Sequence, residues 1–552
     1  MTPGLVKRRT VYAEFSLDTP LFGGQLKTCR TLSVALAAVG FAFLRPVAAQ
    51  QPDTTRELSA YEELQLFSGV LNHIRANYMD SVRYHALMRA AIDGMLHSLD
   101  PHSYYLSRRD FERQNALERG DLPGIGAILD QEDSAITVLT VIRGSPAAKA
   151  GVQPGDRVTA INDTVVAQSK LADVSLRLAG PEGSTVQLRL ERGTRLEPDT
   201  VSVVLTRKTY KLPSVYSTML SDHLTGFVRL EWFGPKAGDE VRDAVRGVQH
   251  RGAQRLILDL RDNPGGLVDG AVDVASEFLP TNTLVFRTRG RKSDATKDFG
   301  TSHEGPFRSL PLIVLVNERS ASAAEALAGS LQDHDRALIV GRRTFGKALA
   351  QAPFLLTPSG DVVMLTIARV LTPSGRIIQR RYQSLGFEQY LSFAGKGGAA
   401  EDTTAVFKTD RGREVRGGGG IAPDVLVAAP PGLPAWWSVA ADSGFDFAVA
   451  DSLAATLPAT PAAREQWIDD SARWSTQLLQ PYLQRVRSRL HVNAQVEEAT
   501  AERISLALAS RVADVRWPPD GASALWMRHD PDVRAALANF GRLDALLGAR
   551  PQ

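Results

Sequence analysis

Short apolar runs separated by helix-like segments constrain the fold of this chain more than any other feature. Five of them recur between residues 211 and 430: "GFVRLEWF", "RLILDL", "PLIVLVN", "ALIVG" and "VVMLTIARV". Each is long enough for one buried strand, and helical apolar spacing follows several of them. Strands that alternate with helices favour a layered fold. We therefore predict an α/β core over residues 211–430.

Three regions with other patterns flank this core. Residues 50–116 carry apolar residues at three- and four-residue spacing, which predicts a helical segment. Residues 117–210 contain short β-branched runs such as "AITVLTVI" and "TVQLRL", divided by Gly, Pro and Asp, and are predicted to form a small β-rich domain. Beyond a Pro/Ala-rich linker, residues 431–552 have the pattern of a helical C-terminal region. The 552-residue chain is therefore expected to be multidomain.

The first 49 residues have the pattern of a secretory signal peptide. Basic residues flank an apolar run that is shorter than the roughly 20 residues needed to span a bilayer. Small residues at Val47 and Ala49 predict cleavage before Gln50. We expect export to a bacterial cell envelope, in the periplasm, or membrane anchoring if the segment is retained. The only cysteine, Cys29, lies in this segment, so the mature protein is expected to contain no disulfide.

The charge of the chain argues against one class of partner. The formal net charge of +3 depends on basic residues of the signal segment, and the remainder is nearly neutral. A nucleic-acid-binding protein usually carries a basic patch or stripe. We therefore expect no nucleic-acid partner.

Two serines lie where a buried strand is expected to meet a helix. Ser320 and Ser322 follow "PLIVLVN" and precede the helix-forming "AAEALAGSLQDH". Such a turn exposes a side-chain oxygen and directs backbone N–H groups from the helix start. A serine there is either an N-cap, which is the commoner role, or a nucleophile. The patterns GxSxG, SxxK and HExxH are absent from the chain.

A serine nucleophile needs a base, and a lysine is the remaining candidate. His334 has the polar surroundings of a surface histidine. Lys347 follows "ALIVGRRTFG", an apolar strand and a Gly-bounded loop. That setting can desolvate an amine and lower its pKa until it accepts a proton. The alternative is an exposed surface lysine.

The segment "SASAAEALAGSLQDHDRALIVGRRTFGKALAQ" resembles the C-terminal processing peptidases, also called tail-specific proteases. The resemblance implies that Ser322 is the nucleophile and Lys347 the general base. It also matches Asp333 and Gln351 to a family aspartate and glutamine, which are expected to orient the dyad. Asp333 is equally compatible with a helix-surface carboxylate or an ion pair.

The same resemblance extends over further segments in family order. "LDPHSYYLS", "LILDLRDNPGGLVDGAVDVASEFL", "TIARVLTPSGRIIQ" and "GGGGIAPDV" all look like family landmarks. In the "NPGG" turn a glycine N–H can approach a developing alkoxide closely, so Gly265 or Gly266 is expected to form an oxyanion hole with Ala323. Ala348 departs from the family, which commonly has glycine after the lysine. The fold that the resemblance implies for the core is crotonase-like.

A second resemblance concerns residues 117–210. "GSPAAKAGVQPGDRVTAINDTVV" resembles the PDZ domain family, and "LPGIGAIL" matches its carboxylate-binding loop. Successive N–H groups in such a loop form a concave site for a carboxylate, beside a strand edge that accepts an extended peptide. The expected binding residues are Gly124, Ile125, Gly126 and Ala127. The alternative is that the two glycines only make a tight turn.

Together these features predict an exported serine endopeptidase that binds protein C-termini through its PDZ domain and cleaves through an acyl-enzyme. No metal or other cofactor is required. The expected partners are proteins or peptides with accessible C-termini, and the helical regions are candidates for self-association. The rival hypothesis is a catalytically silent envelope adaptor that binds protein tails. The expected domains are a signal peptide (1–49), a helical segment (50–116), a PDZ domain (117–210), a peptidase core (211–430) and a helical region (431–552).

Overall fold

The computed structural model describes most of the chain from residue 58 to residue 545. The residues outside this description are 1–57, 133–134, 143, 154, 167–168, 195–196, 212–213, 383–389, 391–404, 443, 518–520, 544 and 546–552. The expected signal peptide, residues 1–49, therefore lies outside the described residues. The chain divides into two compact units, whose described residues are 58–98 and 99–545.

The first unit consists of two helices. They are α1 (Ala60–Asn77) and α2 (Tyr84–His97). Helix α1 begins at Ser59, whose backbone N–H donates to the Glu62 carboxylate at 2.8 Å while the Glu62 N–H donates back to the Ser59 hydroxyl. This reciprocal capping fixes the helix start. None of the helices in the described part of the chain has the combined length and hydrophobicity of a bilayer-spanning segment.

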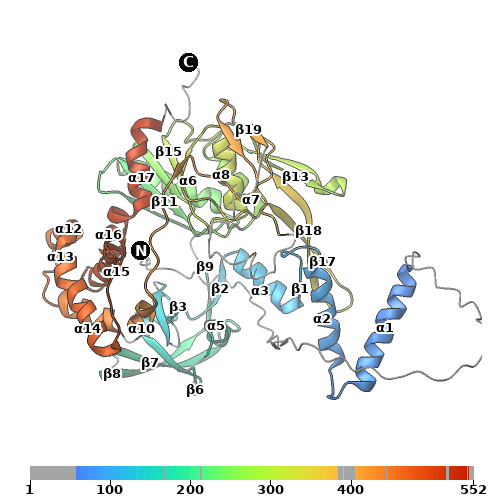
Figure 1. The fold of residues 1–552 in the computed structure, drawn as a ribbon, viewed down its shortest axis with the longest axis horizontal. Coiled ribbons are helices and arrows are strands. Elements are labelled where there is room, and N and C mark those ends of the chain that lie inside the picture. Colours follow the sequence, from blue (N-terminus) through green and yellow to red (C-terminus); the bar gives the residue numbers. More distant parts are fainter. Residues whose placement is uncertain are drawn as a thin grey trace, which may run out of the picture. The chain divides into compact units, whose positions relative to one another are not determined.

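The β-rich domain lies near the start of the second unit in the sequence (Figure 1). Its main sheet has the order β3 (Ala127–Glu132), β4 (Ala135–Val141), β5 (Arg157–Ile161), β7 (Thr185–Thr194), β8 (Glu197–Thr206), with β6 (Thr164–Val165) beside β5. A separate ribbon pairs β2 (Asp121–Gly124) with β9 (Lys208–Lys211), and the helices are α4 (Pro146–Lys149) and α5 (Leu171–Leu178). Strand β3 lies at an edge of the main sheet, so one side of it is open to a further strand.

A mostly parallel sheet forms the centre of the predicted α/β core. Its strand order is β10 (Val215–Met219), β11 (Thr225–Leu230), β12 (Arg255–Asp259), β15 (Leu312–Val316), β16 (Leu338–Gly341), β21 (Val425–Leu426). Only the β10–β11 pair of this sheet is antiparallel. Four of the five predicted runs thus form neighbouring parallel strands, which need helical crossovers and cover on both faces. The fifth run, "VVMLTIARV", instead lies in a second sheet, where it pairs with antiparallel neighbours.

Helices cover both faces of this sheet (Figure 1). Helices α6 (Ala237–His250), α7 (Val268–Ser276) and α8 (Ala323–Asp333) pack on the face that includes Val228, Leu258 and Val314. The alternate strand residues, including Phe227, Ile257 and Ile313, pack against α17 (Pro531–Asn539) and η3 (Phe540–Arg542). The C-terminal region is helical, as predicted. Its last helix, however, completes the α/β core, because this face of the sheet would otherwise leave apolar side chains in water.

A second sheet belongs to the same core. It has the order β1 (Tyr104–Leu106), β18 (Val362–Leu371), β13 (Leu284–Gly290), β14 (Lys297–Gly300), and β17 (Leu349–Leu355) also pairs with β18. The remaining short elements of this part are α3 (Arg108–Glu118), η1 (Ser293–Ala295) and a hairpin of β19 (Val406–Lys408) and β20 (Glu414–Arg416).

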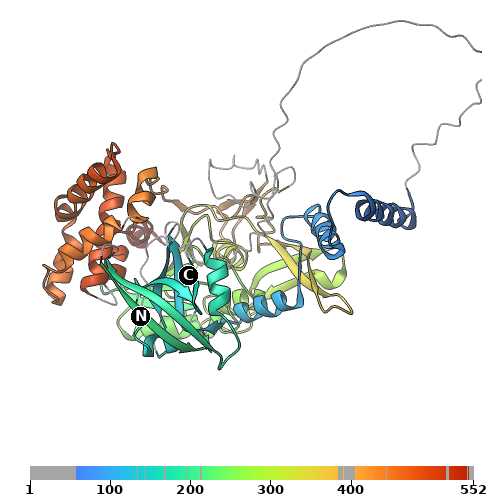
Figure 2. The same cartoon turned by 90° about the horizontal axis from the view of Figure 1, so that it is seen from below.

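The other C-terminal helices form one group around their own apolar core (Figure 2). They are α10 (Ala435–Asp442), α11 (Phe445–Ala454), α12 (Pro461–Asp469), α13 (Ser471–Trp474), η2 (Ser475–Leu479), α14 (Gln480–Leu490), α15 (Glu498–Arg516) and α16 (Gly521–His529). Buried tryptophans, among them Trp467 and Trp474, fill that core. Ion pairs from Arg261 to Asp530 and Asp532 tie the start of α17 to the end of β12.

Candidate active site

Ser322 lies at the turn between β15 and α8, as the sequence predicts. Every residue of β15 is buried, and α8 begins directly after the serine. Ser322 has φ 57° and ψ −115°, a strained conformation for a residue with a side chain. The surroundings hold it there: the Ala321 N–H donates to the Asn263 carbonyl at 2.9 Å, and the Ser320 hydroxyl donates to the Leu260 carbonyl at 2.7 Å. Ser320 therefore stabilises the turn that presents Ser322.

The carboxylate of Glu325, one turn into α8, joins the serine turn to the lysine loop. One of its oxygens accepts the Ser322 N–H at 2.9 Å and the Lys347 N–H at 2.8 Å. The other accepts the Thr344 hydroxyl at 2.5 Å and the Gly346 N–H at 2.6 Å. A carboxylate between two backbone segments fixes their spacing more firmly than packing alone, because each hydrogen bond is directional.

Burial governs the protonation of this pair. Glu325 is 0% exposed, and desolvation raises its pKa to about 7 although its four hydrogen bonds act in the opposite direction. The side chain of Lys347 is partly buried, and desolvation lowers its pKa. The carboxylates of Glu325, Glu118 and Asp100 oppose that shift. A lysine with a lowered pKa is neutral in a larger fraction of molecules and can accept a proton.

A buried network supports the backbone after Lys347. His102 Nε2 and the Tyr390 hydroxyl share a hydrogen bond of 2.7 Å, and the Tyr390 hydroxyl also accepts from Gln379 at 3.2 Å. The Gln379 side-chain oxygen in turn accepts the Ala348 N–H at 2.7 Å. Burial lowers the pKa of His102 to about 3, so its imidazole is neutral at neutral pH. The network therefore positions the lysine loop without adding a charge.

The "NPGG" turn lies directly against the serine. A Cβ atom on Gly265 would lie 2.8 Å from the Ser322 Cβ, so only glycine fits between this turn and the nucleophile. The Gly265 N–H donates to the Asn263 side chain at 2.8 Å. In the described part of the chain, the N–H groups of Gly266 and Ala323 have no hydrogen-bond acceptor. These two donors therefore remain available to an oxyanion.

The structure does not bring Asp333 to the dyad. Asp333 is the last residue of α8, which places it about 15 Å along the helix from Ser322 at the usual rise per residue. Its carboxylate pairs with the buried Arg376 at 2.6 Å and accepts the Ser374 N–H at 3.0 Å. The ion-pair alternative describes its position, and the expectation that it orients the dyad is wrong because the helix separates the two groups.

Gln351 lies on β17, opposite Thr366 of β18. In the described part of the chain its side-chain Nε2 is buried and has no hydrogen-bond partner, and no hydrogen bond is described between Gln351 and Lys347. A buried donor without a partner costs free energy. It is therefore a candidate contact for a group that enters the site with a substrate.

The expected carboxylate-binding loop lies between β2 and β3. Gly126 has φ +78°, and a Cβ there would lie 2.2 Å from the Ser145 Cβ, so the loop requires glycine at this position. The Ile125 and Gly126 carbonyls accept from Ala147 and Ile142, at 3.0 and 2.8 Å. Among the described hydrogen bonds, the N–H groups of Ile125 and Gly126 have no acceptor. With Gly124 and Ala127 at its two ends, the loop next to the β3 edge leaves two N–H donors unused.

Sequence reasoning missed Glu325 and the His102 network. Glu325 follows Ser322 by three residues, which is the spacing of a helix capping box, and that pattern would have indicated its bond to the serine N–H. His102 belongs to the noted segment "LDPHSYYLS", but the approach of Tyr390 is a tertiary contact without a local signal. Among the described residues, no group of three or more His, Cys, Asp or Glu side chains could hold a metal ion.

Comparisons with known proteins agree with this geometry. Residues 224–388 match the model of peptidase family S41, and residues 137–192 match a PDZ domain model. The chain is 34% identical over 337 residues to the carboxy-terminal-processing protease of Bartonella bacilliformis, covering 60% of this chain and 76% of that protein. It is also 34% identical to the carboxyl-terminal-processing protease of Synechocystis sp., covering 52% of this chain and 68% of that protein.

Among solved structures, the photosystem II D1 C-terminal processing protease is 27% identical, with a TM-score of 0.36, covering 67% of this chain and 87% of that one. The family-model match contains both the "NPGG" turn and the serine–lysine pair that the structure brings together. The PDZ match falls on the β-rich domain that precedes them. The chain belongs to peptidase family S41, the carboxyl-terminal-processing serine proteases.

Proposed function

We propose that this protein is an endopeptidase in which Ser322 is the nucleophile and Lys347 the general base. The observation that carries the proposal is the shared carboxylate: one Glu325 oxygen accepts the backbone N–H of both residues. The two loops are thereby held at a fixed separation. The strained backbone of Ser322 and the lowered pKa of Lys347 both fit an activated hydroxyl.

In the proposed reaction, neutral Lys347 takes the proton of the Ser322 hydroxyl while the serine oxygen attacks the substrate carbonyl carbon. The carbonyl π-electrons move to its oxygen, which the N–H groups of Ala323 and Gly266 stabilise. The lysine then gives its proton to the leaving amine as the C–N bond breaks, leaving an acyl-enzyme. Water, activated by the same lysine, hydrolyses the ester and restores both groups.

Gly266 is proposed as the glycine donor because Gly265 already donates its N–H to Asn263. Gly265 instead provides the close approach of the turn to Ser322. We further propose that the parallel sheet with its crossover helices makes the core crotonase-like.

The PDZ domain is proposed to bind the C-terminus of a substrate protein. Its support is the pair of unused N–H donors at Ile125 and Gly126, beside the open edge of β3. Residues 1–49 are proposed to direct export to the cell envelope, on the basis of their signal-like sequence. The N-terminus of the protein secreted by a bacterial host tests this: Gln50 is expected, and an unprocessed chain retained inside the cell would contradict it.

The test of the mechanism compares four proteins on an unstructured substrate that ends in apolar residues. Ser322→Ala and Lys347→Ala are each expected to lose about ten-thousand-fold or more of the activity. Ser330→Ala is the matched control, because this buried hydroxyl on the same helix has no hydrogen-bond partner among the described residues, and it is expected to cleave like the parent. Cleavage that persists in both active-site variants would remove the mechanism. Tail binding without cleavage by any of the proteins would favour the silent adaptor.

A further inference from the structure

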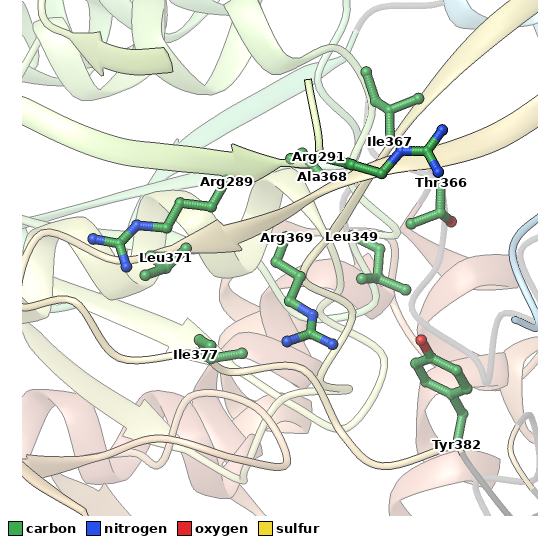
Figure 3. Close-up of a pocket in the computed structure, with 11 residues that line it drawn as sticks. Arg289, Arg291, Leu349, Thr366, Ile367, Ala368, Arg369, Leu371, Ile377 and Tyr382 are labelled. Carbon is green, nitrogen blue, oxygen red and sulfur yellow. The ribbon is translucent and has the colours of Figure 1, made fainter. Parts of the chain in front are cut away.

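A hollow of about 480 Å³ lies beside the lysine loop, between strands β13, β17 and β18 (Figure 3). Part of its lining is apolar: Leu349 and Leu371 are buried, and Ile377 and the ring of Tyr382 also line it. Leu349 follows Lys347 by two residues, so the hollow adjoins the proposed base. A substrate segment that passes the dyad on this side would enter it.

Three arginines surround the hollow: Arg289 and Arg291 from the β13 end and Arg369 from β18. Arg289 and Arg369 are direct cross-strand partners in the antiparallel β13–β18 pair. Like charges in that position destabilise a sheet. The side chains of all three are without a hydrogen bond or ion pair in the described part of the chain. By contrast, Arg287 of the same strand pairs with Asp298.

Figure 3 shows how these side chains are directed. The guanidinium of Arg369 extends toward the gap between Ile377 and Tyr382, whereas Arg289 and Arg291 extend to opposite sides. The charges therefore follow the hollow instead of converging on one point. This arrangement suits an extended chain, with one carboxylate at Arg369 and apolar neighbours against the apolar part of the lining, better than a compact polyanion.

We propose that this hollow is a substrate subsite that selects a carboxylate close to the cleaved bond, with Arg369 as its main determinant and Arg289 and Arg291 as flanking cations. The carboxylate belongs either to an Asp or Glu side chain or to the terminal α-carboxyl group of the substrate. The inference rests on the proposed peptidase function. It adds a charge preference that is separate from tail binding by the PDZ domain.

The test measures binding in the Ser322→Ala background and cleavage in the parent enzyme. The probes are short apolar peptides with amidated C-termini, each carrying one Glu at a successive position, beside matched Gln peptides. A second arm uses neutral peptides with a free or amidated C-terminus. Binding and kcat/KM are measured for Arg369→Gln. The matched control is Arg246→Gln, which changes an exposed arginine on α6.

The expected result is that Glu at one position near the cleaved bond binds and is cleaved about five- to tenfold better than Gln, and that Arg369→Gln removes this difference while Arg246→Gln keeps it. In the second arm, a preference for the free C-terminus that is lost in Arg369→Gln assigns the carboxylate to the chain end. A preference for the free C-terminus that persists in Arg369→Gln is instead assigned to the carboxylate-binding loop of the PDZ domain.

Equal binding of every Glu and Gln pair, together with no Arg369-dependent preference for a free C-terminus, would overturn the subsite. So would a carboxylate preference that Arg369→Gln leaves unchanged in both arms. Cleavage by the parent would still stand in these cases. Absence of cleavage by the parent would instead remove the proposed function, while the binding preference could still be measured.

Discussion

The two ends of helix α8 each hold a buried acidic residue, and the two differ in their partners. At the N-terminal end, Glu325 accepts four hydrogen bonds from backbone and hydroxyl groups and forms no ion pair with any described residue. At the C-terminal end, Asp333 forms an ion pair with Arg376. A guanidinium keeps a buried carboxylate ionised, whereas neutral donors only partly offset desolvation. The arrangement at Glu325 suits a site whose protonation can change, and the ion pair at Asp333 suits a structural contact.

The largest expected effect on stability comes from removing the ion pair at the C-terminal end of α8. Asp333→Asn leaves the buried Arg376 without its ion-pair partner, and loss of one partner of such a pair costs about 3–5 kcal/mol. Urea denaturation is expected to show this loss. Asp410→Asn is the control, since that carboxylate is exposed and its pair with His334 is worth less than about 1 kcal/mol. Equal midpoints for the two variants would show that the Asp333 pair is not structural.

The next prediction concerns the pH dependence of stability. Below the ordinary pKa of 4.5 Glu325 is protonated in the folded and unfolded states, but between 4.5 and about 7 only the folded state keeps the proton. The free energy of unfolding therefore falls as pH rises through this range, by an amount on the order of 3 kcal/mol. Glu325→Gln is expected to lack this component when both proteins are unfolded in urea at several pH values. Identical pH slopes would contradict the raised pKa.

At constant pH, Glu325→Gln is expected to reduce kcat about 10- to 100-fold. An amide retains one acceptor oxygen and places a donor against the N–H groups of Ser322 and Lys347. Loss of one or two charge-assisted hydrogen bonds accounts for that range. Single-turnover cleavage by the correctly folded variant measures it. A kcat equal to that of the parent would show that the carboxylate does not position the dyad.

The sequence predicts the features of this fold that depend on local contacts, but not those that depend on contacts between residues far apart in the chain. The α/β core, the β-rich domain and the helical C-terminal region follow from local patterns, the resemblance of one segment identifies the β-rich domain as a PDZ domain, and these predictions are confirmed. The role of α17 as cover for the central sheet could not be predicted, because a helix with an apolar face gives no signal for which surface it will cover.

The candidate site likewise contains residues that the sequence predicts and residues whose position only the structure shows. The flanking strand, helix and loop make Ser322 and Lys347 candidates, the resemblance to the C-terminal processing peptidases selects them, and the structure brings their backbones together at Glu325. Asp333 was matched to a family aspartate without regard to the length of α8, which separates it from the serine. Glu325 carried a local signal that was not used.

The smallest expected effect concerns the support of the lysine loop. Tyr390→Phe removes the hydroxyl between His102 and Gln379, and so loosens the contact with the Ala348 N–H. A three- to tenfold lower kcat is expected from the loss of about 1 kcal/mol of hydrogen bonding. Tyr482→Phe is the matched control, because that buried hydroxyl in the C-terminal helices has no hydrogen-bond partner in the described part of the chain. Equal effects of the two variants would exclude a positioning role for Tyr390.

The most direct test of the account is the pH profile of kcat/KM for Glu325→Gln and Asp333→Asn, measured beside the parent below the unfolding temperature of each. The acid limb reports the deprotonation of Lys347, whose pKa the Glu325 carboxylate raises. Glu325→Gln is expected to move the acid limb of the kcat/KM profile to lower pH, while Asp333→Asn is expected to leave it in place. The opposite result, an acid limb shifted by Asp333→Asn and unchanged by Glu325→Gln, would contradict the assignment of Glu325 to the active site and of Asp333 to a structural ion pair.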